Sequence, residues 1–407
     1  PSSVMLAALA EAVGREPEWL RFGIASQATA RIGALIRDCR RAVQDDDTEQ
    51  VENCLRDLLD RDLGRPLTRE ELDLSLFFKA YVLSHRGKDG DAVALLEPLV
   101  ARLLHGECGL APVALGQKYL GAAYFGFQQG DVALEVLSEA SARTRRILAT
   151  VRPDHRDDDW WRLAATATSA DYSVCGPAAA LAQGSSWLAE LEELDAGRAP
   201  SGVAALRWNI GLYLAELGRP GEGLAHLSVA VRLHDVERYP CDGARLRMEY
   251  AMIWMMSCPE AVEQAITVLE STLPDLERHA YPSDLWEWRI IRARAEIVAG
   301  RTESVPALVS PILAASDDDL MTRATTWMIL GDARALRDEV GDAGEAYDRA
   351  ASFLSRSSRR WGRSRHWRDL GDRYLRLGFR DRAVTAYDRA LTIADLPAFP
   401  GVPPLRV

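Results

Sequence analysis

The sequence predicts an all-α fold, a right-handed α-solenoid of about nine helix pairs. A pattern of apolar residues and glycine repeats near the C-terminus at a constant offset (367 − 327 = 40): Trp327, Leu330 and Gly331 match Trp367, Leu370 and Gly371. Most of the remaining chain has helical apolar periodicity, and no strand-like alternation is sustained. Glycine and proline interrupt it where turns between pairs are expected, at 64–66, 106–109, 197–202, 239–243 and 281–282.

The most regular repeat lies at residues 364–397 and resembles the tetratricopeptide (TPR) unit. Its first helix carries the W-x2-L-G-x2-Y order and its second the A-x3-aromatic pair, closed by a proline: Trp367, Leu370, Gly371, Tyr374, Ala383, Tyr387 and Pro397. Small residues fill the slots where two helices touch most closely, and large apolar residues fill the space around them. The offset of 40 exceeds the roughly 34 residues of the common TPR, so longer helices or turns are expected.

The same spacing is found in the rest of the chain, where the copies match fewer positions of the motif. Residues 26–63 form the first expected pair. Three further copies keep part of the motif: Ala80, Leu83, Ala92, Leu96 and Leu99; Leu120, Gly121, Tyr124, Ala133, Leu137 and Ala140; Ile210, Gly211, Leu214, Gly218, Gly223, Leu227 and Ala230. Segments near 160–194, 245–272 and 286–314 have the length and the apolar pattern but match the motif poorly. Stacking of all these pairs buries one continuous core.

The first 23 residues differ from the repeats. A helix stopped by Gly14 and a short second helix stopped by Gly23 resemble the last two helices of the Cro/C1-type (XRE) helix-turn-helix domain, through Leu9, Ala10, Ala12, Val13, Gly14, Trp19, Leu20 and Gly23. The alternative is a generic capping helix at the end of a solenoid. The resemblance predicts three regions: an XRE remnant at 1–23, a TPR-like solenoid at 24–395 and a Pro-rich tail at 396–407.

Together the two resemblances are similar to the peptide-pheromone receptor regulators of Gram-positive bacteria. In that family the solenoid binds a short signal peptide on its concave face and often dimerises. Peptide binding changes the DNA affinity of the attached DNA-binding domain, which we call the reader domain. The resemblance therefore implies a signal peptide or small molecule as ligand and a homodimer. Contact with DNA is expected only through a reader domain missing from this chain, whose recognition helix would precede Pro1.

In such a stack the first helix of each pair lines the concave wall. Positions one residue after the Trp slot and one turn further on share a face. They predict these ligand-binding residues: Phe77, Tyr81, Lys118, Phe125, Trp208, Asn209, Leu212, Arg289, Met328 and Arg368. Asn209 could clamp a peptide backbone with donor and acceptor at once, or bind only water on a helix surface. The stretch Met248, Met252, Met255 and Met256 is typical of a core stripe or of an adaptable binding surface.

Composition and motifs exclude several classes of function. The formal net charge of −11 disfavours a nucleic-acid surface. Three aspartate triplets, at 45–47, 157–159 and 317–319, each precede a helical segment. They are therefore expected to cap helix N-termini and not to bind a metal ion. We found no catalytic motif, so neither an enzyme nor a cofactor is predicted. Six scattered cysteines, no membrane-length apolar run and no signal peptide favour a soluble cytoplasmic protein without membrane contact.

The leading hypothesis is the ligand-sensing and dimerisation region of a cytoplasmic transcriptional regulator. The alternative is a TPR scaffold that docks a protein partner and has no DNA-linked role. A regulator of an enzyme, such as a phosphatase or kinase, is a third possibility.

Overall fold

The computed structural model describes most of the chain between Ser26 and Ala394, in two compact units that we treat separately, Pro1–Glu107 and Cys108–Val407. The described residues are 26–44, 48–59, 63, 65–86, 88–105, 120, 130–150, 158–194, 200–234, 240–279, 282–315, 320–357 and 360–394. The expected XRE remnant at 1–23 and the Pro-rich tail at 396–407 lie outside them. Within the described helices, none combines the length and the apolar character that crossing a membrane requires.

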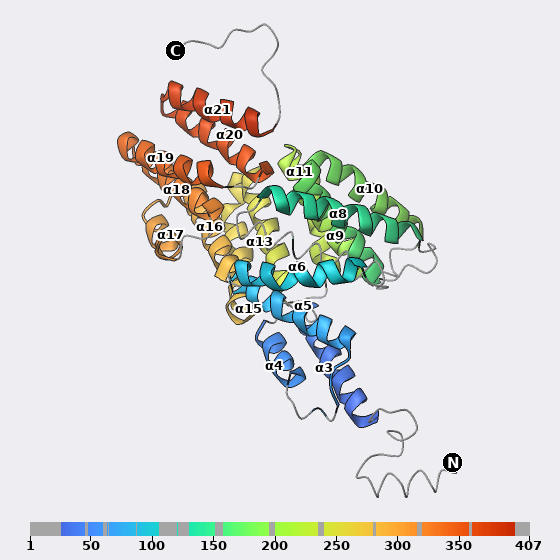
Figure 1. Cartoon of the computed structure of the whole chain (residues 1–407). Coiled ribbons are helices and arrows are strands. Elements are labelled where there is room, and N and C mark those ends of the chain that lie inside the picture. The colour runs from blue at the N-terminus through green and yellow to red at the C-terminus, as the bar shows by residue number, and fades with distance from the viewer. Residues whose placement is uncertain are drawn as a thin grey trace, which may run out of the picture. The chain divides into compact units, whose positions relative to one another are not determined.

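The described residues of the first unit form two helix pairs (Figure 1). Helices α3 (Ser26–Gln44) and α4 (Thr48–Leu58) form one pair, and α5 (Arg69–His85) and α6 (Asp89–His105) form the other. Helix α5 begins with a capping box, in which the backbone N–H groups of Glu71 and Thr68 each donate to the other residue's side chain. Arg65 donates two hydrogen bonds to the same Glu71 carboxylate, at 2.6 and 2.8 Å.

The second unit continues with consecutive helix pairs, shown in chain order in Figure 1. Its first helices are α9 (Asp158–Cys175), α11 (Pro200–Glu216), α13 (Pro240–Ser257), α16 (Pro282–Val298), α18 (Leu320–Ala335) and α20 (Arg360–Arg376). The second helices are α10 (Pro177–Leu194), α12 (Pro220–Leu233), α14 (Val262–Glu270), α17 (Val305–Ala314), α19 (Val340–Arg356) and α21 (Arg380–Ile393). Helix α8 (Gly130–Thr150) packs against α9.

The predicted all-α solenoid of TPR-like pairs is confirmed in the part of the chain that the structure describes. First helices begin at Pro200, Pro240, Pro282, Leu320 and Arg360, which reproduces a period close to the one read from the sequence. The core lies between successive pairs. In the last two repeats Trp367, Leu370 and Tyr374 are all buried in one cluster with Tyr347.

The glycine slots of the repeat are places of close helix approach, as the motif predicts. A Cβ atom added to Gly331 would lie 2.2 Å from Cε1 of Tyr347, and one added to Gly371 would lie 2.6 Å from Cε1 of Tyr387. Between α11 and α12 a Cβ on Gly223 would meet the Gly211 carbonyl oxygen at 2.6 Å. Only glycine allows the two helices of these three pairs to approach this closely.

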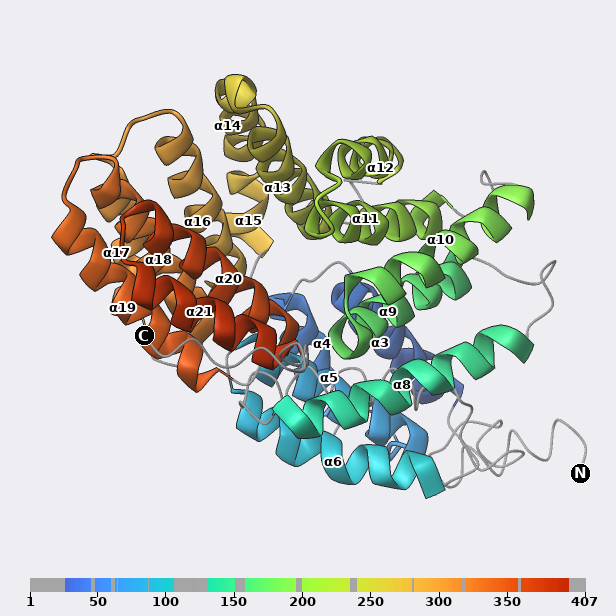
Figure 2. The same cartoon turned by 90° about the horizontal axis from the view of Figure 1, so that it is seen from above.

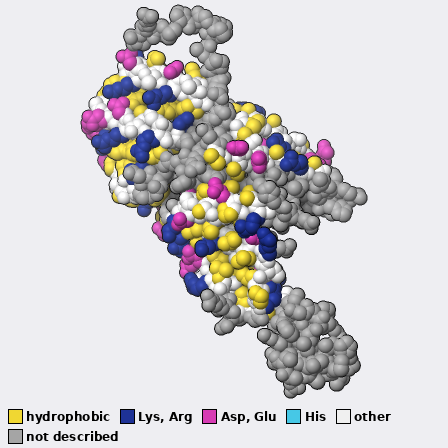
Figure 3. Space-filling model, in the orientation of Figure 1, with side chains coloured by type: hydrophobic (Ala, Val, Ile, Leu, Met, Phe, Trp, Pro, Cys, Tyr) yellow, Lys and Arg dark blue, Asp and Glu magenta, His cyan; other side chains and the backbone are white. Residues whose placement is uncertain are grey.

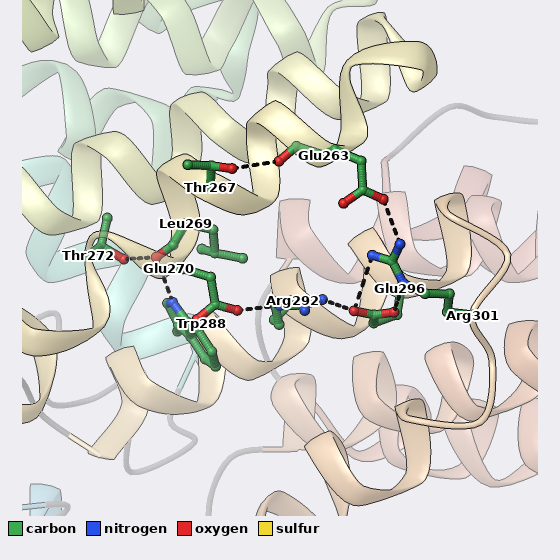
Figure 4. Close-up of polar contacts among 9 residues, drawn as sticks. All are labelled: Glu263, Thr267, Leu269, Glu270, Thr272, Trp288, Arg292, Glu296 and Arg301. Atoms are coloured by element: carbon green, nitrogen blue, oxygen red, sulfur yellow. Dashed lines mark hydrogen bonds and ion pairs between the residues drawn. The ribbon is translucent and has the colours of Figure 1, made fainter.

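The pair expected near 245–272 differs from the regular pattern. After α13 a 3-10 turn at Pro259–Ala261 precedes α14, and a separate short helix α15 (Leu273–His279) follows it. The helix is interrupted just before Pro274, because proline has no backbone N–H to continue the helical hydrogen bonds. The Leu269 carbonyl at the break accepts hydrogen bonds from Thr272 Oγ1 at 2.7 Å and from Trp288 Nε1 at 3.0 Å (Figure 4).

A chain of ion pairs holds this irregular pair to the next one (Figure 4). Arg292 donates to Glu270 at 2.6 Å, and Arg301 donates to Glu263 at 2.5 Å. Both arginines also bind Glu296, a buried carboxylate. Burial favours a higher pKa for Glu296, but the hydrogen bonds from Arg301 and Arg292 outweigh it and lower that pKa.

Candidate functional site

The first helices of the second unit form a curved row, seen from above in Figure 2. Helix α9 packs against α11, and α13, α16, α18 and α20 pack against one another in that order. Helix α11 is joined to α13 by the hydrogen bond between Trp208 and Glu249. Arg365 on α20 nevertheless forms an ion pair of 2.6 Å with Glu216 on α11, 149 residues away in sequence. This pair connects first helices that are several repeats apart, so the row curves with its first helices on the inside. We call the side of these helices that faces this curve the inner face.

Contacts across the inner face follow one register. Trp208 pairs with Glu249, Thr325 with His366, and Asp332 with Arg373, each with an offset of 41 residues. Neighbouring first helices are parallel and one period apart, so side chains about one repeat apart in sequence lie opposite each other. The sequence analysis did not use this signal, although complementary polar residues 41 positions apart were visible in it.

Trp208 and Asn209 are adjacent on α11 but contact different neighbours. The half-buried Trp208 donates its indole N–H to the Glu249 carboxylate on α13. The Asn209 amide donates to α9 instead, to the Ala165 carbonyl at 2.8 Å and to Thr168 Oγ1 at 2.9 Å. Asn209 Nδ2 also lies 3.3 Å from Ser169 Oγ. The donor group proposed to clamp a ligand is therefore used within the protein in this structure.

The other expected ligand residues are distributed among several environments. Leu212 and Arg289 are half-buried, and Leu212 packs on the cluster of Leu227 and Leu246. Met328 is 2% exposed in the core, while Arg368 is exposed on α20. Ligand contact by these residues stays a prediction.

The remaining expected residues belong to the earlier part of the chain. Phe77 is half-buried and Tyr81 is 3% exposed on α5, in the first unit. Lys118 and Phe125 lie outside the described residues. The methionine stretch divides as both of its interpretations allowed: Met248 and Met255 are core residues, whereas Met252 is half-buried and Met256 is 65% exposed.

Glu249 is an inner-face carboxyl group that the sequence analysis missed. It is half-buried and accepts the hydrogen bond from Trp208. Burial and the nearby Glu287 carboxylate raise the pKa of Glu249 to about 8, and the Trp208 hydrogen bond acts in the opposite direction. Near neutral pH this group is therefore mostly an uncharged acid.

Three arginines gather further along the same face, and they differ in how they are satisfied. Arg373 donates two hydrogen bonds of 2.8 Å to the Asp332 carboxylate, which also accepts the Tyr347 hydroxyl at 2.8 Å. Arg365 pairs with Glu216, which accepts Tyr172 as well. Arg294 on α16 has a single hydrogen-bond contact, to Met252 Sδ at 3.7 Å, and no ion pair within 4.0 Å among the described residues. Burial, followed by the charges of Arg373 and Arg365, lowers the pKa of Arg294 to about 10, so it is charged at neutral pH.

The described residues hold no cluster of three or more His, Cys, Asp or Glu side chains suited to a metal ion. The side chains of the three aspartate triplets lie outside this description. Over α18 to α21, on the face shown in Figure 3, basic and acidic side chains are interspersed and do not form a patch of one sign.

Comparison with known proteins identifies the fold and not the family. No family model matches the chain, and no curated protein matches it. A Rap protein complexed with Competence and Sporulation Factor is similar in structure, with a TM-score of 0.50 and 13% identity over 96% of this chain and 93% of that one. The Rap conjugation gene regulator of plasmid pLS20, in complex with the Phr* peptide, gives a TM-score of 0.52 and 11% identity over 91% and 98%.

A third similar structure is the APC/C hetero-tetramer Cut9-Hcn1. Its TM-score is 0.50, with 13% identity over 86% of this chain and 57% of that one. At these identities the similarity extends to the helical-repeat architecture alone.

Proposed function

We propose that this chain is the ligand-sensing and dimerisation region of a cytoplasmic transcriptional regulator. Its inner face binds a signal peptide or a small molecule, and DNA is contacted through a reader domain attached before residues 1–23. The observation that carries the proposal is the curved row of first helices, which presents the guanidinium group of Arg294 against Met252, one helical turn from the exposed side chain of Met256. Unused donors next to exposed apolar atoms are typical of a surface that recognises a ligand.

Two further observations support the choice of a peptide and of a regulator. Both Rap proteins of similar fold are described in complex with a peptide or factor. The XRE resemblance of residues 1–23 supplies the link to DNA. We propose a binding protein and not an enzyme, because the sequence offers no catalytic motif and inner-face groups such as Asp332, Glu216 and Glu249 are engaged in pairs that hold helices together.

Peptide selection on the purified chain tests the ligand-binding part. A pool of random pentapeptides is incubated with the protein, bound species are identified by mass spectrometry, and their affinities are measured by calorimetry. Met256→Arg places a bulky charge on the inner face and should weaken binding at least tenfold. Val384→Arg makes the same change at a position of similar chemistry on the second helix α21, 50% exposed, and should leave affinity unchanged. Equal effects of the two substitutions would contradict an inner-face site.

The regulator part is tested separately. Sequence encoded directly before Pro1 should contain a helix-turn-helix, and the joined protein should change its DNA affinity when the selected peptide is added. Sedimentation of the chain at micromolar concentration should show a dimer. A chain with neither property, but with an intact peptide site, would be a sensor of another kind.

The second candidate is a scaffold that docks a protein partner. The structural similarity to Cut9-Hcn1, a hetero-tetramer, is the observation that favours it. A scaffold of this kind would bind folded partners or long segments and ignore pentapeptides, so the same selection distinguishes the two candidates.

A further inference from the structure

Four side chains from two adjacent first helices form a small patch on the inner face. Met252 and Met256 lie one turn apart on α13, and Arg294 and Val298 lie one turn apart on α16. The Met252–Arg294 contact fixes the register between the two helices. The same offset (294 − 252 = 298 − 256 = 42) places Met256 and Val298 at one level. We call these four residues the α13–α16 patch.

The patch combines exposed apolar atoms with an unsatisfied cation. Met256 is 65% and Val298 is 41% exposed, although both are apolar. Arg294 is half-buried, and a guanidinium group carries five N–H donors, of which the structure shows one engaged, by a thioether sulfur that accepts weakly. Planar donors without an acceptor are suited to a carboxylate, which can accept two parallel hydrogen bonds.

The acids around Arg294 do not fill that role. Asp332, whose charge acts on Arg294, is held by Arg373 and Tyr347. Asp369 contributes an attractive charge from α20 but forms no ion pair with Arg294 within 4.0 Å. The donors of Arg294 are therefore available to a ligand.

A charged side chain further along the inner face determines how a bound ligand is oriented. Glu287 lies two turns before Arg294 on the same face of α16, roughly 10 Å away along the helix. Glu287 repels an anion at that end, and Arg294 attracts one at the other. Three extended residues span about the same distance.

We infer that the α13–α16 patch binds the C-terminal residue of a peptide, with the terminal carboxylate on Arg294 and an apolar side chain against Met256 and Val298. The inference rests on the proposed function and specifies how the ligand is oriented. A medium-chain fatty acid presents the same chemistry, an apolar group beside a carboxylate, and serves as the competing ligand in the test.

The test uses two N-acetylated pentapeptide pools that end in leucine and contain only uncharged residues at the other positions. One pool has a free C-terminal carboxylate and the other a C-terminal amide; octanoate is the third probe. The wild-type chain should bind the acid pool about ten- to hundred-fold more tightly than the amide pool, because a charge-assisted pair is lost in the amide. Arg294→Gln should reduce acid binding to the amide level, and Arg294→Lys should retain part of the preference.

Arg380→Gln is the matched control, since it removes one exposed arginine charge from the second helix α21. It should leave the preference for acids intact. Equal binding of acids and amides by the wild-type chain, or unchanged binding by Arg294→Gln, would overturn the inference while leaving the peptide-sensing function in place. If neither peptide pool binds, the inference and the proposed function both fail, and binding of octanoate alone would assign the patch to a fatty acid.

Discussion

Arg365 Nη1 lies 2.6 Å from Glu216 Oε1, and this pair joins the last first helix of the solenoid to one four repeats earlier. Glu216 also accepts the Tyr172 hydroxyl at 2.9 Å, and the Tyr172 ring stacks on Tyr213 with centroids 5.3 Å apart. Helices α9, α11 and α20 therefore meet at one carboxylate. This contact between distant repeats shows that the row of first helices is curved.

We expect the Arg365–Glu216 pair to contribute little to stability. The two side chains are 43% and 24% exposed, so water screens their attraction. A double-mutant cycle with Arg365→Gln and Glu216→Gln should give a coupling energy of about 0.2–1 kcal/mol in urea unfolding. A coupling of zero at low salt would mean that the contact does not persist in solution.

Gly331→Ala should destabilise the repeat strongly. The new methyl group would meet the buried Tyr347 ring, and the expected loss is about 1–3 kcal/mol of unfolding free energy. Gly341→Ala is the control within the adjoining helix α19, where a Cβ has no neighbour within 4 Å. Alanine reduces the entropy of the unfolded chain there, so it should stabilise by about 0.4–1 kcal/mol. If both substitutions had the same effect on urea unfolding, the close packing of α18 on α19 would be wrong.

Asn209→Ala should lower stability even when no ligand is present. Its amide donates to the Ala165 carbonyl and to Thr168, and removal of a partly buried donor costs about 1–2 kcal/mol. Thermal unfolding of the ligand-free chain measures this loss. A variant with unchanged stability but weaker peptide binding would instead support the backbone clamp predicted from the sequence.

Glu249 should make stability depend on pH near neutrality. Its pKa is raised to about 8 in the folded chain, above the unfolded value of 4.5. Between these values the folded state holds more protons, so the free energy of unfolding falls as pH rises from about 4.5 to about 8. Glu249→Gln keeps an oxygen that can accept from Trp208 and should remove this part of the pH dependence. Urea unfolding of both proteins between pH 4 and 9 tests it, and identical slopes would contradict the assigned environment of Glu249.

The sequence predicted the repeat well because its signal is local and recurrent. Trp367, Gly371 and Ala383 occupy slots whose sizes are fixed by how closely two helices approach, and that requirement is the same in every pair. The break between α14 and α15 shows the limit. Pro274 stood in the sequence, but whether a proline ends a helix or starts the next depends on groups such as Trp288 that satisfy the exposed carbonyl.

The candidate site was predicted less well. Helical periodicity placed Trp208 and Asn209 on one helix, yet it could not specify that one bonds to α13 and the other to α9. Met328 occupied an equivalent position and lies in the core. Arg294 and Glu249 were not selected at all, because the unpaired donors of Arg294 and the buried environment of Glu249 are recognised only when the neighbouring helices are known.

The amino-acid sequence by itself determined that this chain is helical, that its helices pair and stack with a period near forty residues, and where glycine lets them touch. These follow from steric and apolar patterns within a few turns of chain. Only the tertiary structure decided which polar groups satisfy one another and which remain available, because residues a repeat or more apart meet through the packing of whole helices. The availability of Arg294 is a property of that packing.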